Sequence, residues 1–178
     1  KPVHYLCDEE RGWMPDIDHL VSCITPKTRG IVVINPNNPT GAVYSREILD
    51  TIVQVARAND LVLFSDEIYE KITYGGSVHV PLGSLSDDVL TLTFNGLSKA
   101  HRSAGFRGGW LVISGDKTGA SDYIEGLQIL SNMRLCSNVP AQLAVQMALE
   151  GYQSINELTA ADGRLTVQRD YLHKRLVS

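Results

Sequence analysis

The sequence predicts an α/β fold, a three-layer α/β/α sandwich on a mostly parallel sheet, with helices at its C-terminal end. Two observations predict it: short β-branched runs alternate with helical patterns along the first two thirds of the chain, and the last third is helical throughout. At 178 residues, with 43% hydrophobic and 20% charged residues, the chain has the composition of a soluble globular domain. Its length is sufficient to bury a substantial core.

Short apolar runs predict the strands of the sheet. They cover residues 30–34, 61–64, 89–94 and 110–113. The first run stops at Asn35-Pro36, since proline cannot continue a central strand. The second leads directly into Ser65-Asp66-Glu67, and the fourth is entered through Gly108-Gly109. The third leads into Asn95-Gly96, so residues typical of a turn lie at one end of each run.

The helix between the first two strands has both a start signal and an apolar face. Ser45 suits the N-cap, and Glu47 lies favourably in the first turn. The apolar positions recur at helical spacing at Ile48, Leu49, Ile52, Val53 and Ala56. We expect this face to pack on the sheet.

The last third of the sequence predicts three helices. In the first, one face is shared by Tyr123, Leu127 and Leu130. The second has Pro140 in its first turn, Gly151 as its stop and three residues expected to face inward, namely Leu143, Ala144 and Met147. A third helix is expected over residues 155–176, where Leu158, Leu165, Leu172 and Leu176 recur, although Gly163 interrupts the pattern. The chain stops at residues 175–178 without cap or breaker, which suggests a cut through an element.

Charge and cysteine content exclude several classes of function. A net charge of -4 and a pI near 5.7 give no reason to expect nucleic acid or an anionic membrane as partner. No apolar run is long enough to span a bilayer, and the first residues are not a secretion signal. Cys7, Cys23 and Cys136 are odd in number and have no metal-ligand spacing, so we expect reduced thiols, no metal site and a cytoplasmic location.

The polar residues of interest follow three predicted strands, at the edge where open α/β sheets bind ligands. Asn38 follows the first strand, Asp66 and Tyr69 follow the second, and Lys99 and Arg107 follow the third. Each has an ordinary explanation when taken alone. Residues 35–41 suit a tight loop, Asp66 a cap, Lys99 a solvated amine and Arg107 a surface ion pair. Only the combination points to chemistry.

Three motifs in this order carry a family resemblance. They are NPNNPTG at residues 35–41, SDEIY at 65–69 and SKxxxxxGxR at 98–107. With them the chain resembles the class I and II aminotransferases that depend on pyridoxal 5′-phosphate (PLP), over residues 1–178. The resemblance implies the large domain of PLP-dependent transferase fold type I, with a homodimer as the intact enzyme.

The resemblance assigns the catalytic roles to Lys99, Asp66 and Tyr69. Lys99 would carry PLP as a Schiff base and, once freed, move a proton between the substrate Cα and the cofactor. Asp66 would keep the pyridine nitrogen protonated, since a nearby carboxylate favours the cationic form. Tyr69 and Asn38 would donate hydrogen bonds to the phenolate oxygen, and Asn38 would also help to bind the substrate carboxylate.

Phosphate binding is assigned by the same resemblance to Arg107, with Ser98 adding a hydroxyl or backbone contact. Arginine suits this role because its guanidinium can pair with phosphate through two parallel hydrogen bonds. Many relatives have a further phosphate-binding serine three residues before the lysine, where this chain has Gly96. The family also has a cis peptide before the proline of its NPTG motif, here Asn38-Pro39, which the sequence cannot establish.

Within the family, longer phrases resemble bacterial glutamate–pyruvate (alanine) aminotransferases. They are residues 4–9, 94–99, 104–107 and 133–142, and Gly96 is a feature of that group as well. The implied reaction transfers an amino group between alanine and 2-oxoglutarate. Such enzymes are about twice as long, so residues 1–178 are expected to be the central part of the large domain. Without the N-terminal phosphate loop and the small domain with its carboxylate-binding arginine, we expect the isolated chain to be inactive.

Three alternatives stay open. A β-C–S lyase or an aminocyclopropane-carboxylate synthase would share Asn38, Asp66, Tyr69, Lys99 and Arg107. A transcription regulator with an aminotransferase-like, PLP-sensing domain would show a basic winged helix-turn-helix upstream of it. An α/β domain with coincidental motifs would have none of this chemistry.

Overall fold

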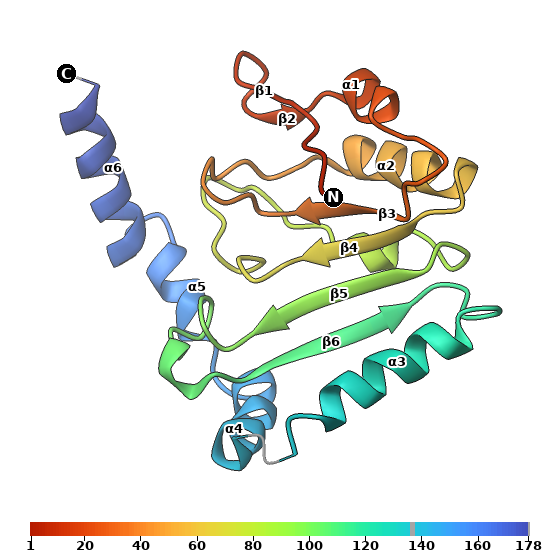
Figure 1. The fold of residues 1–178 in the computed structure, drawn as a ribbon. Helices are drawn as coiled ribbons and strands as arrows, with labels where there is room; N and C mark the ends of the chain where they lie inside the picture. The colour runs from red at the N-terminus through yellow and green to blue at the C-terminus, as the bar shows by residue number, and fades with distance from the viewer. Residues whose placement is uncertain (136–137, 178) are drawn as a thin grey trace.

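The centre of the structure, a computed structural model that describes residues 1–135 and 138–177, is a four-stranded sheet in the order β3-β4-β5-β6 (Figure 1). Its strands are β3 (Gly30–Ile34), β4 (Val62–Asp66), β5 (Thr91–Gly96) and β6 (Gly109–Ser114). The first three are parallel, and β6 runs antiparallel to β5. The prediction of a mostly parallel sheet is thus confirmed, with strand bounds shifted by one or two residues from those expected at β4, β5 and β6.

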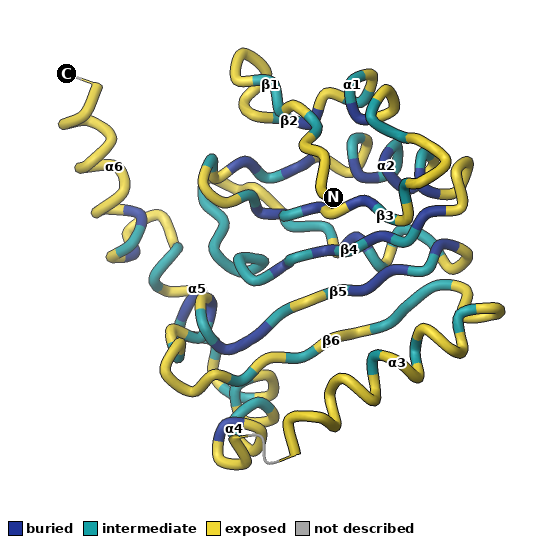
Figure 2. The backbone as a smooth tube through the Cα atoms, in the orientation of Figure 1, coloured by how far each residue is buried: buried dark blue, intermediate teal, exposed yellow. Residues whose placement is uncertain are grey.

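Helix α2 (Arg46–Ala58) covers one face of β3 and β4 and forms the core with them. The hydroxyl of Ser45 accepts a hydrogen bond of 3.4 Å from the amide of Ile48, which confirms the expected N-cap. The fully buried residues of the helix pack against Ile31, Val33 and Leu63 of the two strands, and buried positions recur along all three elements in Figure 2. They are Leu49, Ile52, Val53 and Ala56.

Alternation along the strands separates two faces of the sheet. Val33 and Ser65 are paired in register and lie on the face of α2, so Asp66 points to the opposite face. That opposite face is more open, since Val32 and Phe94 are 58% and 40% exposed. The remaining small elements flank the sheet: β1 (Cys7–Asp8) and β2 (Met14–Pro15) pair antiparallel, and α1 (Ile17–Ser22) lies beside α2.

The C-terminal third forms α3 (Ser121–Asn132), α4 (Val139–Glu150), α5 (Ser154–Thr159) and α6 (Arg164–Leu176). Pro140 lies in the first turn of α4 and Gly151 is its C-cap, both as predicted. The expected helix over residues 155–176 is in fact two helices. Gly163 is the N-cap of α6, and a Cβ there would lie 2.3 Å from the carbonyl oxygen of Glu157, so no other residue fits this break.

The inward face predicted for α4 is wrong at two of its three residues. Leu143 and Met147 are 71% and 72% exposed, and only Ala144 is half-buried. The recurring leucines of α6 are exposed too, Leu172 at 57% and Leu176 at 84%. Helical spacing predicts which side of a helix is apolar, but it does not supply the surface against which that side packs. Figure 1 shows α6 extending away from the sheet.

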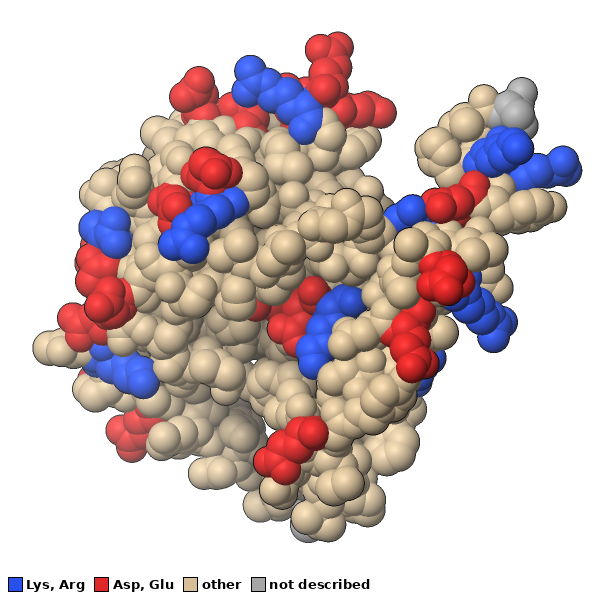
Figure 3. Space-filling model, turned by 180° about the vertical axis from the view of Figure 1, so that it is seen from behind, with Lys and Arg blue, Asp and Glu red and all other residues tan. Residues whose placement is uncertain are grey.

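The described cysteines and the charges on one face of the molecule can be set beside the expectations from the sequence. Cys7 and Cys23 are free thiols, and Cys136 lies outside the described residues. On the face drawn in Figure 3, Lys and Arg side chains are interspersed with Asp and Glu and form no continuous basic area. Among the described helices, none combines the length and apolarity needed to cross a bilayer.

Candidate active site

Parallel pairing brings the motif residues to one edge of the sheet. Ile34, Asp66 and Phe94 are neighbours across β3, β4 and β5, so the loops that follow these three strands leave from the same edge. The loop from β5 to β6 both starts and ends at this edge, because β6 is antiparallel to β5 and Gly109 pairs with Gly96. This topology explains how residues 38, 66, 69, 99 and 107 share one end of the sheet.

Asn38 lies at the tip of the loop after β3. Hydrogen bonds between side chains of the loop hold its shape. Asn37 donates to the hydroxyl of Tyr44 at 3.2 Å, and Thr40 donates to the side-chain oxygen of Asn37 at 2.8 Å. The Asn38–Pro39 peptide is cis, in agreement with the resemblance, and so is Asn35–Pro36. The bracing leaves the amide of Asn38 exposed and directed at Tyr69.

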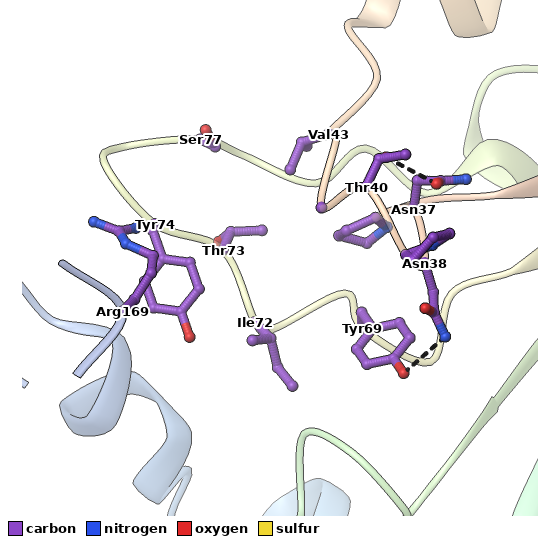
Figure 4. Close-up of a pocket in the computed structure, with 13 residues that line it drawn as sticks. Asn37, Asn38, Thr40, Val43, Tyr69, Ile72, Thr73, Tyr74, Ser77 and Arg169 are labelled. Atoms are coloured by element: carbon purple, nitrogen blue, oxygen red, sulfur yellow. Dashed lines mark hydrogen bonds between the residues drawn. The ribbon is translucent and has the colours of Figure 1, made fainter. Parts of the chain in front are cut away.

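Asn38 and Tyr69 meet across two loops. The side-chain amide of Asn38 donates a hydrogen bond of 3.3 Å to the Tyr69 hydroxyl, drawn as a dashed line in Figure 4. Both residues line a cavity of about 530 Å³. At its other end Arg169 of α6 stacks on the ring of Tyr74, with 4.4 Å between the guanidinium carbon and the ring centroid.

Asp66 is the last residue of β4 and is half-buried. Its Oδ1 accepts a hydrogen bond of 3.1 Å from the amide of Ile68, which turns the chain away from the strand. Oδ2 is left for a ligand, since no other hydrogen bond or ion pair to this carboxylate occurs within the described residues.

Lys99 follows β5 and is exposed. Its Nζ lies 5.6 Å from the centroid of the Tyr69 ring, so the lysine faces the same loop as Asn38. No hydrogen bond or ion pair holds this amine within residues 1–135 and 138–177. Lys99, Tyr69 and Asn38 therefore form one continuous cluster at this edge of the sheet.

Arg107 and Ser98 are not joined to this cluster by any hydrogen bond between described residues. The guanidinium of Arg107 donates to the carbonyl oxygen of Ala104 at 2.7 Å, and its backbone has φ 53°, in the left-handed region. A non-glycine residue in that region is held there at a cost, and such residues concentrate at functional sites. Ser98 is half-buried beside Lys99.

Gly96 has a structural reason that the sequence did not reveal. A Cβ at this position would lie 2.9 Å from the carbonyl oxygen of Gly108 and 3.1 Å from the Cα of Gly109. Both contacts are to backbone and cannot relax easily. The close approach of β5 and β6 therefore requires glycine, and a phosphate-binding serine does not fit here.

Buried polar residues lie behind the site and were not predicted from the sequence. Glu67 and Asn35 are each 2% exposed, and the side chain of His79 is 7% exposed. Alternation from Leu63 through Ser65 places Glu67 on the buried face, which is the signal that could have singled it out. Nothing in the sequence indicated His79.

Comparison with known proteins places the chain in a family. The profile of the aminotransferase class I and II family matches residues 1–178. The chain belongs to the class I and II aminotransferase family. It is 59% identical to the Escherichia coli glutamate-pyruvate aminotransferase AlaA over 170 residues, which are 96% of this chain and 42% of that protein. It is also 59% identical to the Mycobacterium tuberculosis alanine aminotransferase over 175 residues, 98% of this chain and 41% of that protein.

Solved structures of aminotransferases have the same fold. An Escherichia coli aminotransferase superposes with a TM-score of 0.93 at 59% identity, covering 96% of this chain and 42% of that one. The Pyrococcus furiosus alanine aminotransferase superposes with a TM-score of 0.89 at 38% identity, covering 99% and 44%. These similarities confirm the predicted family and fold class. The chain spans about two fifths of the length of these relatives.

Proposed function

We propose that the chain is the central part of the large domain of a PLP-dependent aminotransferase. Its reaction would be the exchange of an amino group between alanine and 2-oxoglutarate, giving pyruvate and glutamate. The observation that carries the proposal is the cluster of Asn38, Tyr69 and Lys99. It lies at the edge of the sheet where β4 ends with Asp66. The choice of alanine rests on the 59% identity to the glutamate-pyruvate and alanine aminotransferases.

The donor set fits PLP. Lys99 offers an exposed amine without an ion-pair partner among the described residues, and Asp66 has one carboxylate oxygen uncommitted. Asn38 and Tyr69 offer an amide and a phenol that already point toward one another beside a cavity. When bound, PLP would supply an electrophilic aldehyde carbon and an electron-accepting ring.

The chain's own residues would then hold the reactants and control where protons lie. The Lys99 amine would bind the aldehyde carbon and, when released, take a proton from the substrate Cα. Asp66 would keep a proton on the ring nitrogen through its negative charge. Asn38 and Tyr69 would donate hydrogen bonds to the phenolate oxygen, and Asn38 would also help to orient the substrate carboxylate. Arg107, with Ser98, would hold the phosphate through the guanidinium N–H groups that are not bonded to the carbonyl oxygen of Ala104.

The remaining parts of the proposal concern the intact enzyme. We infer that it is a cytoplasmic homodimer that takes a small amino acid and a 2-oxo acid, binds no nucleic acid or membrane and uses no metal. The arginine for the substrate carboxylate would come from outside residues 1–178. The isolated chain should therefore show no measurable alanine transamination, since substrate orientation supplies much of the rate.

The decisive experiment is borohydride reduction of the full-length protein with PLP, followed by peptide mapping. The adduct should lie on Lys99 and vanish in Lys99→Ala, while Lys117→Ala, a change of an exposed lysine away from the site, should keep it. An adduct elsewhere, or none in folded protein, would refute the proposal. Product analysis separates the alternatives: glutamate from alanine and 2-oxoglutarate indicates transamination, whereas pyruvate and ammonia from cysteine conjugates indicate a lyase.

A further inference from the structure

Behind the candidate site lies a buried chain of polar groups, defined here as the Asn35–His79–Glu67 relay. Its members come from three separate segments: the end of β3, the turn after β4 and the stretch before the short 3-10 helix Leu82–Ser84. All three side chains are at least nine-tenths shielded from solvent. Buried polar groups are costly unless they are fully hydrogen-bonded, so each contact in the relay matters.

The direction of every hydrogen bond in the relay can be assigned. The side-chain oxygen of Asn35 accepts from the backbone amide of Tyr44 at 2.9 Å, which leaves its Nδ2 to donate to Nδ1 of His79 at 3.4 Å. His79 Nδ1 is then an acceptor, so the proton is on Nε2, which donates to Oε2 of Glu67 at 3.0 Å. The relay therefore fixes the orientation of the His79 ring, with Nε2 as the donor to Glu67.

Glu67 closes the relay at its other end. Its Oε1 accepts from the hydroxyl of Ser65 at 2.8 Å and from the backbone amide of Leu82 at 2.9 Å. With His79 on Oε2, the carboxylate accepts three hydrogen bonds in a dry environment. Such a fully satisfied network fixes geometry more firmly than apolar contacts alone.

The position of the relay connects it with the site. Asn35 begins the loop whose tip is Asn38, and its bond to Tyr44 closes that loop at the base. Glu67 directly follows Asp66 and lies two residues before Tyr69. The backbone bonds the same segments together, because Asn35 donates to the carbonyl oxygen of Asp66 at 3.0 Å.

We propose that Glu67 and His79 are positioning residues, which fix the loop of Asn38 and the turn of Asp66 and Tyr69 relative to each other. They act from the buried face of the sheet, while Asp66 faces the opposite side. The proposal rests on the proposed function for the identity of the ligand, but the positioning itself is a property of the folded chain. Loss of the relay should loosen both loops and weaken the grip on the cofactor.

The test uses His79→Ala, Glu67→Gln and His79→Gln in the full-length protein, with two readouts. Hydrogen exchange without cofactor should show faster exchange of the Tyr44 and Leu82 amides in the first two variants, by about tenfold, the effect of one lost buried hydrogen bond. The dissociation constant of PLP should rise by about tenfold as well. His79→Gln keeps a donor for Glu67 and should recover most of both losses.

The matched controls are Ile52→Val and Leu49→Ala, which remove buried apolar atoms of α2 on the same side of the sheet. They should lower Tm. The dissociation constant of PLP should stay unchanged, and so should the exchange rate of the Tyr44 amide relative to global unfolding. If His79→Ala behaves like these controls, the proposal is overturned. If it fails to fold, Ser65→Ala, which removes one hydrogen bond to Glu67, decides by the same readouts, with an expected change of about threefold.

The two proposals fail separately. If the wild-type protein does not bind PLP, the proposed function is wrong, while the exchange of the Tyr44 and Leu82 amides still tests positioning. If the wild-type protein binds PLP and the relay variants bind it equally well with unchanged exchange, only the positioning proposal is wrong.

Discussion

The side-chain amide of Asn38 donates a 3.3 Å hydrogen bond to the hydroxyl of Tyr69 across the end of the sheet. The two residues are 31 positions apart in the sequence. The same tyrosine ring lies 5.6 Å from Nζ of Lys99. Tyr69 therefore connects the loop after β3 with the loop after β5. This central place makes it the most informative single position for substitution.

Tyr69→Phe in the full-length protein should lower kcat by about tenfold to a hundredfold, because it removes one donor to the cofactor and the partner of Asn38. The ring contact with Lys99 is kept, so the protein should still bind PLP. Steady-state kinetics and a PLP titration measure both effects. Tyr74→Phe is the control: it keeps the ring on which Arg169 stacks and should leave kcat within twofold of wild type. Equal losses in the two variants would contradict this role for Tyr69.

Asp66→Asn should lower kcat by at least about a hundredfold, since a neutral side chain no longer favours a protonated ring nitrogen. The free energy of unfolding should change by less than about 1 kcal/mol, because the asparagine oxygen can still accept from the amide of Ile68. Kinetics and urea denaturation measure the two quantities.

A matched control exists for this substitution. Asp116 makes the same kind of turn, with its Oδ1 accepting from the amide of Thr118 at 2.7 Å, outside the candidate site. Asp116→Asn should leave kcat unchanged. Full activity in Asp66→Asn would remove Asp66 from the catalytic machinery.

Local sequence patterns correctly predicted the strands and helices whose own residues determine where they begin and end. The strand at residues 30–34 and the helix capped by Ser45 agree with the structure, because buried β-branched runs and a capping hydroxyl act within a few residues. The shared edge followed from parallel pairing, which places Ile34 beside Asp66 and Asp66 beside Phe94.

Features that depend on distant contacts escaped prediction. The need for glycine at 96 comes from the backbone of Gly108 and Gly109, which only the antiparallel pairing of β6 brings close. His79 joins Glu67 and Asn35 by way of an irregular segment with no periodicity to reveal it. The inward faces expected at Leu143 and Met147 were wrong because a helical pattern specifies a side of a helix and not its partner.

Gly96→Ser should destabilise the full-length protein by roughly 1–3 kcal/mol, since its Cβ would approach the backbone of Gly108 and Gly109 to 2.9 and 3.1 Å. Introducing the serine found in many relatives should therefore weaken the fold without improving PLP binding. Urea denaturation and a PLP titration check both statements. Gly126→Ser, in α3, meets no atom within 4 Å and should not be destabilising; a similar loss in both variants would refute the packing argument.

High pH should destabilise the fold, because the buried phenol of Tyr5 then loses its proton. Burial raises the pKa of this phenol to about 12, and its hydroxyl donates a 3.0 Å hydrogen bond to the carbonyl oxygen of Val32. Because the folded state keeps the proton that the unfolded chain loses near pH 10, the contribution is complete below pH 10. It is lost as the pH rises from 10 to 12.

Tyr5→Phe removes this contribution. The phenol of Tyr44, whose pKa is raised first by burial and then by Tyr5, is present in both proteins. Below pH 10 the variant should be less stable than wild type by about 1 kcal/mol, the value of the lost hydrogen bond. Between pH 10 and 12 the difference should shrink, since only the wild type carries the Tyr5 proton into the folded state. Urea denaturation from pH 8 to 11.5 measures it, and a difference that stays constant over this range would show that Tyr5 ionises equally in both states.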